Sequence, residues 1–176
     1  MKSTGVVRRI DDLGRIVIPK EIRKNLRIKE GDNLEVFVDN EDIIFKKYSM
    51  MNKINDLSQE LTDAIYTFTK HNVFITDTDT VLAGSGKLKK DFLNKPISNF
   101  IIKSIGRRER ILENHFKELN FVNDEQIECS YILSTILVNG EATGMIVIIS
   151  EDEKLSEVEM QLASIVSSFM TKYLEQ

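Results

Sequence analysis

Cysteine is almost absent from this 176-residue sequence, which contains Cys129 and no other. A single cysteine excludes an internal disulfide and a metal cage built from several thiolates. Long apolar runs are missing too. No stretch of the sequence approaches the ~20 residues that cross a bilayer, and the N-terminus lacks the apolar core of a secretion signal. We therefore expect a cytoplasmic protein that makes no contact with membranes.

Histidine is equally scarce, which leaves few candidates for catalysis. His71 and His115 are the only two histidines, and neither lies in a recognisable catalytic motif, so we interpret both as structural or surface residues. Cys129 falls in an expected strand, where a buried inert thiol is typical. The stretch 84–90, GSGKLKK, lacks the spacing of a phosphate-binding loop. The sequence predicts no catalytic residue, no metal site and no cofactor.

Charge is distributed unevenly along the chain. The whole sequence has a net charge of −4 with 41% hydrophobic and 30% charged residues, which is the composition of a folded protein. Residues 1–29 hold nine lysines and arginines against three acids, 9 − 3 = +6, so the remainder carries −10. A basic end on an acidic protein is typical of a polyanion-binding head, although cations that protect a strand edge give the same count.

The first 50 residues are patterned as short strands and turns. A turn is expected at 11–14, where Gly14 can adopt a positive φ angle, and a helix over 19–26; strands are expected over 5–10, 15–18, 33–38 and 43–48. A segment of about 50 residues without a disulfide or a metal buries too little apolar surface to be stable alone. Its strands need partner strands, so residues 1–50 are predicted to form an obligate dimer.

Residues 51–176 are expected to form an α+β domain, in which helices pack on an antiparallel sheet. Strand patterns occur at 71–77, 80–86, 128–138 and 142–150, and the pair Asn139-Gly140 predicts a hairpin between the last two. The stretch 97–116 has the pattern of a helix with a break at Gly106. Within it, the basic cluster GRRER at 106–110 is interpreted as a solvated helix face rather than a nucleic-acid site.

Two helices with apolar residues spaced alternately by three and four positions flank this second segment. The first spans 52–70 and the second 155–174; the spacing is carried by Ile54, Leu57, Leu61, Ala64 and Phe68, and by Leu155, Val158, Leu162, Ile165 and Phe169. Such a stripe serves either a contact between subunits or the packing of a helix on a sheet. Two heptads in each helix do not distinguish these alternatives.

The opening stretch gathers the cations that contacts with DNA require. Arg8 and Arg9 end one expected strand, Arg15 begins the next, and Arg23 and Lys24 lie on the short helix that follows. Guanidinium groups bind phosphate and also offer a bidentate fork to guanine. A dimer doubles this set into a symmetric basic surface, which matches a two-fold site on double-stranded DNA.

The same stretch carries a resemblance to a known family. The run VVRRIDDLGRIVIPKEIRKNL at 6–26, with IIFKKY at 43–48, resembles the swapped-hairpin DNA-binding domain of the AbrB family of bacterial transition-state regulators. The resemblance implies that two chains interleave their hairpins into one β-barrel that binds A/T-rich promoter sites, where DNA shape is recognised. It implies DNA contacts from Arg8, Arg15 and Arg23. Lys24 stands where arginine is common, and Arg9 is added from its charge and position.

The second segment has the length and pattern of the GAF domain that follows in AbrB-like regulators of late sporulation genes. The resemblance implies a sequence-tolerant transcription regulator of forespore genes, activating or repressing them, whose GAF domain binds an unidentified small molecule or joins dimers into a homotetramer through helices 52–70 and 155–174. Two alternatives stay open. One is the antitoxin of a toxin–antitoxin pair, which usually has a disordered tail. The other is an enzyme like the free methionine sulfoxide reductases, whose chemistry uses several cysteines.

Overall fold

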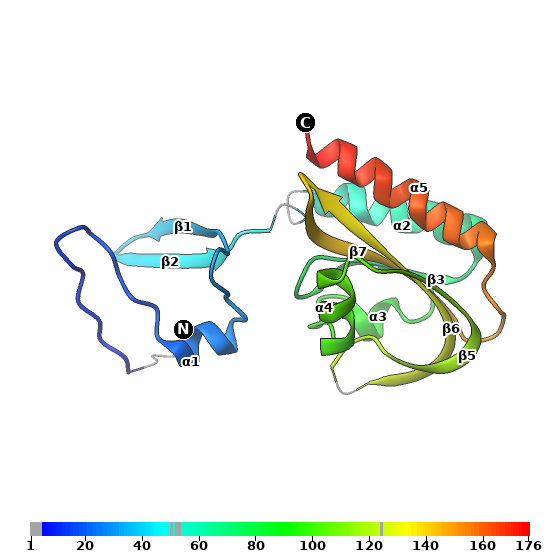
Figure 1. Ribbon diagram of the computed structural model, residues 1–176, viewed down its shortest axis with the longest axis horizontal. Helices are drawn as coiled ribbons and strands as arrows, with labels where there is room; N and C mark the ends of the chain where they lie inside the picture. The colour runs from blue at the N-terminus through cyan, green and yellow to red at the C-terminus, as the bar shows by residue number, and fades with distance from the viewer. Residues whose placement is uncertain (1–4, 50, 52–53, 124) are drawn as a thin grey trace. The chain divides into compact units, whose positions relative to one another are not determined.

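The computed structural model describes residues 5–49, 51, 54–123 and 125–176. The chain divides into two compact units, Met1–Tyr48 and Ser49–Gln176. Figure 1 shows a short helix and a hairpin in the first unit, and a sheet with helices on its two faces in the second. Residues 52 and 53, at the start of the first heptad-patterned helix, lie outside the described residues.

The helix and the hairpin of the first unit follow the sequence pattern. Helix α1 spans Lys20–Asn25 and begins directly after Pro19, whose fixed φ angle favours the first turn of a helix. Strands β1 (Leu34–Asp39) and β2 (Asp42–Lys47) pair antiparallel, and Asn40 turns the chain between them with a φ angle of 53°. The structure confirms this helix and both strands.

The two strands predicted over 5–10 and 15–18 are wrong for the single chain, because neither segment belongs to a ladder. The Asp11 amide donates to the Arg15 carbonyl over 3.1 Å, and this bond closes the turn between the segments. A strand needs a neighbour that bonds its amides and carbonyls along its length. Among the described residues of one chain, no strand bonds these segments along their length, and their pairing with a second chain stays a prediction.

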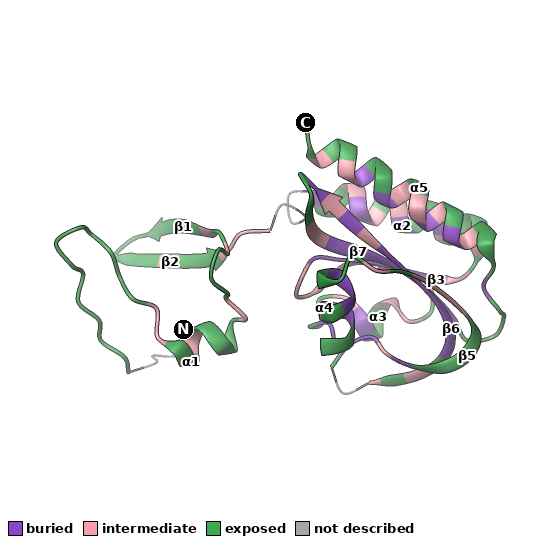
Figure 2. Cartoon of the chain, viewed as in Figure 1, coloured by how far each residue is buried: buried purple, intermediate pink, exposed green. Residues whose placement is uncertain are grey.

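No residue from Gly5 to Tyr48 is buried in the single chain, as the absence of the buried colour in this unit shows (Figure 2). Large apolar side chains are exposed instead, including Val7 at 89%, Val38 at 77% and Val17 at 74%. So many large apolar side chains exposed in one small unit indicate a contact surface. The described residues of the first unit therefore form no core of their own.

The sheet of the second unit has the strand order β4-β3-β7-β6-β5, with every pair antiparallel. Helices α2 (Asn55–Thr69) and α5 (Glu157–Leu174) cover one face, and the short helices α3 (Lys89–Phe92) and α4 (Asn99–Gly106) lie on the other (Figure 1). The strands are β3 Asn72–Thr76, β4 Val81–Ser85, β5 Arg110–Asn120, β6 Gln126–Val138 and β7 Glu141–Ser150.

One prediction for this unit is partly wrong: residues 97–116 are helical only up to the predicted break at Gly106, and the helix does not resume after it. Helix α4 ends at Gly106, Arg108 turns the chain with a φ angle of 57°, and strand β5 begins at Arg110. Strand β5 is the edge of the sheet, and its register with β6 shifts between Glu113 and Lys117. A bulged edge strand loses the strict alternation of apolar and polar residues, so its sequence does not display a strand pattern.

Two hydrophobic cores lie on opposite faces of the sheet. The core beneath α2 and α5 includes Ile65, Met160 and Met170. The core beneath α3 and α4 is built on Phe74, Phe92 and Phe121, whose ring centroids are 5.1–5.5 Å apart in edge or tilted contacts. Aromatic rings from the protein itself therefore fill the inner face of the sheet on the α3–α4 side.

The heptad-patterned helices bury only part of their predicted stripes. Ile54 and Leu155, at the beginning of each stripe, are 7% and 2% exposed. Further along, Phe68 is 72% exposed, and on α5 Val158 is 55%, Ile165 64% and Phe169 46% exposed. The face of α5 that packs on the sheet is formed instead by Met160, Ala163, Ser167 and Met170. Packing of the helix on a sheet is therefore confirmed for the buried face of α5, whereas contact between subunits through the exposed stripe stays a prediction.

Candidate nucleic-acid interface

The turn at 11–14 is organised around the carboxylate of Asp11. Its Oδ1 accepts hydrogen bonds from the amides of Leu13 over 3.0 Å and of Arg15 over 2.7 Å. Its Oδ2 accepts from Nε of Arg15 over 2.8 Å. Gly14 completes the turn with a φ angle of 75°, which glycine adopts without steric cost. The Arg15 side chain is thus held to the turn at one nitrogen while 70% of it stays exposed.

These hydrogen bonds favour the ionised form of Asp11. The bond from the Arg15 amide, followed by the bond from its guanidinium group, lowers the pKa of the Asp11 carboxyl below its ordinary value. Asp11 therefore stays charged, and continues to accept these bonds, to lower pH than an ordinary aspartate. In the sequence, Asp11 is visible only as a residue of the predicted turn. The sequence signal for this role is an aspartate at the first position of the turn, where its side chain can accept a hydrogen bond from the amide two residues later.

Arg23 and Lys24 lie on consecutive positions in the last turn of α1. Such positions are about 100° apart around a helix axis, so the two side chains leave α1 in different directions. The Leu26 amide donates to the Ile22 carbonyl over 2.9 Å and ends the helix directly after them. Both side chains are exposed, as are Arg8 and Arg9 before the turn.

The structure therefore places the five predicted DNA-binding residues on two elements. Arg8, Arg9 and Arg15 flank the turn at 11–14, and Arg23 and Lys24 lie on α1. All five are exposed. The turn brings Arg15 into contact with Asp11, an acid, rather than with another cation. Contact of these residues with DNA stays a prediction.

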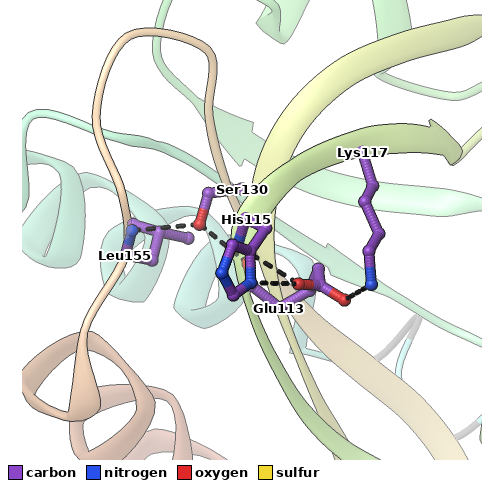
Figure 3. A network of polar contacts seen from close by, with 5 residues as sticks. All are labelled: Glu113, His115, Lys117, Ser130 and Leu155. Atoms are coloured by element: carbon purple, nitrogen blue, oxygen red, sulfur yellow. Dashed lines mark hydrogen bonds and ion pairs between the residues drawn. The ribbon is translucent and has the colours of Figure 1, made fainter.

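In the second unit, His115 belongs to a polar network on the edge strand β5 (Figure 3). Glu113 Oε1 accepts from the His115 amide over 3.1 Å, and Lys117 Nζ bonds Glu113 Oε2. The hydrogen bond from Lys117 lowers the pKa of Glu113. Ser130 Oγ donates to the Glu113 carbonyl over 2.8 Å and accepts from the Leu155 amide over 3.0 Å. The network joins the bulge of β5 to β6 and to the loop before α5, which is a structural role.

Cys129 lies fully buried in β6, where burial raises the pKa of its thiol to about 12. A thiol that stays protonated at neutral pH is a poor nucleophile. Among the described residues, no group of three or more histidine, cysteine, aspartate or glutamate side chains is placed to hold a metal ion. Within the same residues, no helix is long and apolar enough to cross a membrane.

Two family models match the amino-acid sequence. The model described as "Stage V sporulation protein T C-terminal, transcription factor" matches residues 53–175. The model described as "Antidote-toxin recognition MazE, bacterial antitoxin" matches residues 7–52. The first of these covers most of the chain, and the second covers the segment that contains the candidate DNA-binding cations.

Two curated relatives from Bacillus subtilis (strain 168) extend these matches. Stage V sporulation protein T is 45% identical over 179 residues, which cover 100% of this chain and 100% of that protein. Transition state regulatory protein AbrB is 62% identical over 48 residues, 27% of this chain and 50% of AbrB. The resemblance of the first segment to the AbrB family is confirmed.

Among solved structures, a GAF domain from A. Aeolicus is similar to the second unit. It has a TM-score of 0.53 and 14% sequence identity, and the match covers 74% of this chain and 87% of that one. At this identity the likeness shows the fold alone, and it confirms the GAF-like α+β prediction. The full-length relative also supports a transcription regulator over the antitoxin alternative. The chain belongs to the stage V sporulation protein T family, with an AbrB-like N-terminal domain and a GAF-like C-terminal domain.

Proposed function

We propose that this chain is a DNA-binding transcription regulator of sporulation genes, acting in the cytoplasm and without catalysis, and that Arg8, Arg9, Arg15, Arg23 and Lys24 contact the duplex. The single observation that carries this proposal is that all five cations are exposed on a unit in which none of the described residues, 5–48, is buried. A cationic surface supplies most of the affinity for phosphates, while an apolar surface supplies the contact with a second chain.

A dimer of the first unit follows from its exposed apolar side chains. Val7, Val17 and Val38 are more than 70% exposed in one chain, and the segments around Val7 and Val17 lack ladder partners. A second copy of the chain would bury the exposed valines and provide strands that pair with the two segments. The resulting two-fold surface carries ten cations, five from each chain. This arrangement suits a duplex site that is recognised mainly through its phosphates and through the shape of A/T-rich DNA.

Assembly beyond the dimer is proposed through the exposed stripe on α5. Val158, Ile165 and Phe169 line one face of this helix, and Phe68 on α2 is also exposed. A stripe of this spacing suits packing against the same helix of a second subunit. The phenylalanine rings that fill the inner face of the sheet favour an assembly role for the GAF-like unit over the sensing of a bound small molecule.

The proposal is tested by replacing Arg15 or Arg23 with alanine and measuring DNA retention in a gel shift at several salt concentrations. We expect each variant to lose promoter binding while its sedimentation and circular dichroism match the wild type. Lys29→Ala, which removes an exposed cation of the same unit, is the matched control. A surface that contacts ~6–10 phosphates loses roughly 10³–10⁵ in affinity between ~50 and ~200 mM salt. Unchanged binding by both arginine variants contradicts the proposal.

The enzyme and antitoxin alternatives have separate tests. The enzyme alternative predicts reduction of free methionine sulfoxide that is lost in Cys129→Ser; we expect no such activity, because the thiol is buried and protonated. The antitoxin alternative predicts a C-terminal half that a protease removes. We expect limited proteolysis to leave a stable fragment that contains the five-stranded sheet.

A further inference from the structure

A second group of cations lies at the end of α4 and in the turn before β5. Lys103 is in the last turn of α4, Arg107 follows the helix directly, and Arg108 lies in the turn. All three are exposed, and the side chain of Arg107 is 71% exposed. We call these three residues the α4–β5 cation cluster. The predicted solvated helix face does not explain the two arginines, because α4 ends at Gly106 and both arginines follow it.

The cluster belongs to a basic segment within an acidic unit. Residues 49–176 hold 13 lysines and arginines and 19 acids, 13 − 19 = −6. Residues 86–110 alone hold eight basic residues and two acids, 8 − 2 = +6, which leaves −12 for the rest of that unit. Random placement of solubilising charges gives no reason for a separation of this size. A segment that opposes the sign of its own domain indicates a polyanionic partner.

The fold itself explains only part of the cluster. Lys103 complements the negative end of the α4 dipole. Arg107 lies 3.5 Å from the carboxylate of Glu109, and this exposed pair contributes little. Neither Lys103 nor Arg108 has an ion-pair partner among the residues that the structure describes. Arg108 also adopts a φ angle of 57°, which is uncommon for arginine, so neither local charge nor backbone geometry calls for a cation there.

We propose that the α4–β5 cation cluster binds phosphates of the same DNA duplex that the first unit recognises. This inference rests on the proposed function and adds a second contact surface to it. Each strand of a duplex carries one negative charge per ~3.4 Å of the axis, so three cations within six residues can reach neighbouring phosphates of one backbone. The covalent link between the units raises the effective concentration of bound DNA at the second unit, so weak contacts suffice.

A duplex suits this surface better than a membrane does. A flat anionic membrane approaches a broad area of the unit, including its excess of acids, whereas a duplex approaches along a narrow strip. The excess of acids in the rest of the unit repels the broad surface more strongly than the strip. The cluster is therefore assigned to DNA flanking the site of the first unit.

The test compares two double variants of the full-length chain that each remove two positive charges. The first is Arg107→Ala with Arg108→Gly, because glycine accepts the positive φ angle of residue 108. The control is Lys70→Gly with Lys154→Ala, which removes two exposed lysines outside the basic segment 86–110. Lys70 has a φ angle of 62°, so glycine suits this position as it suits position 108.

Binding is measured against salt concentration on a long A/T-rich duplex and on a short duplex that spans only the footprint of the first unit. Each lost phosphate contact reduces the slope of log K against log salt by about 0.9 and the affinity about eightfold at ~0.1 M salt. If both arginines contact DNA in two chains, the slope on the long duplex falls by about 3.6. We expect that loss in the first variant alone, and equal binding of both variants to the short duplex.

Equal slopes for the two variants on the long duplex overturn the inference and leave the proposed function intact. Loss of affinity for single-stranded RNA or for anionic vesicles, with duplex binding unchanged, also overturns it. Failure of the wild-type chain to bind either duplex contradicts the proposed function itself. Thermal unfolding is followed for both variants. If the first variant is unstable, Arg107→Gln with Arg108→Asn removes the same two charges and repeats the comparison, because asparagine tolerates the same φ angle.

Discussion

The exposed stripe on α5 gives a quantitative test of the proposed tetramer. Ile165 lies at its centre and is 64% exposed in the single chain. It borders a shallow groove of about 430 Å³ that is also lined by Ser164, Ser168, Phe169 and Lys172. An exposed isoleucine beside an exposed phenylalanine has no role in the core of its own subunit. Replacing Ile165 with aspartate should therefore leave the subunit folded and weaken only the contact between subunits.

The size of the effect follows from the exposed area. Full burial of an isoleucine side chain contributes about 1.5–3 kcal/mol, so covering the remaining 64% contributes about 1–2 kcal/mol per copy. A two-fold interface contains two copies, which gives about 2–4 kcal/mol. Since ~1.4 kcal/mol corresponds to a tenfold change, the dissociation constant should rise roughly 30- to 700-fold. Burial of an unpaired carboxylate adds to this loss.

Sedimentation velocity over a range of protein concentrations measures the change directly. Wild-type protein should sediment as a tetramer at concentrations where Ile165→Asp sediments as a dimer. The control is Asn99→Asp, which adds the same charge to an exposed position of α4, on the opposite face of the sheet. Identical sedimentation of wild-type and Ile165→Asp protein at every concentration refutes the assignment of the stripe to subunit contact. A lowered melting temperature of Ile165→Asp at the dimer stage would show that the residue belongs to the intramolecular core instead.

Two further predictions concern the GAF-like unit. Cys129, with a thiol pKa raised to about 12, should resist a thiol reagent at pH 8 until the protein unfolds. Because the thiol of the unfolded chain ionises near ~8.5, the free energy of unfolding should fall above that pH by up to ~1.4 kcal/mol per pH unit. Denaturant unfolding, with Cys129→Ser as the control, measures this fall. An alanine Cβ at Gly144 would lie 2.1 Å from the Thr76 carbonyl oxygen, so Gly144→Ala should cost several kcal/mol or abolish folding (more than ~4 kcal/mol is exceptional). Gly106→Ala meets nothing within 4 Å and should be neutral or slightly stabilising in α4; equal melting temperatures for the two glycine variants would contradict this reasoning.

The parts of the fold that local sequence determines were predictable. The pair Asn139-Gly140 adopts φ angles of 50° and 78°, both positive, as a two-residue hairpin turn requires. The capping box of α5, in which Ser156 and Glu159 exchange hydrogen bonds, marks the start of that helix in the sequence. In each case the interactions among a few neighbouring residues are sufficient to determine the local structure.

The failures share the opposite property. Strand β5 exists because β6 bonds one of its sides, and its bulge near Glu113 removes the alternation that would reveal it. The segments at 5–10 and 15–18 have a strand pattern, but their expected partner is a second chain. Both cases depend on a partner distant in sequence, or on another molecule, which a local pattern does not contain.

The candidate site shows the same division. Positions of the cations could be predicted because net charge and the AbrB-like run identify Arg8, Arg15 and Arg23 directly. The pairing of Arg15 with Asp11 could not be predicted from charge, since it depends on the closed geometry of the turn. The heptad spacing likewise identified α5 as amphipathic, but only packing on the sheet separates the buried face from the exposed stripe.

Assembly and DNA binding are physically linked if both proposals hold. The first unit exposes its apolar surface until a second chain covers it, so the free energy of dimerisation is part of the free energy of forming the basic surface. A dimer brings two copies of each cation, and a contact through α5 brings two such surfaces onto one molecule. The second surface then binds at an effective concentration set by the first, so avidity rises without any new residue. DNA affinity should therefore fall together with tetramer content in Ile165→Asp, although that residue lies far in sequence from every proposed DNA contact.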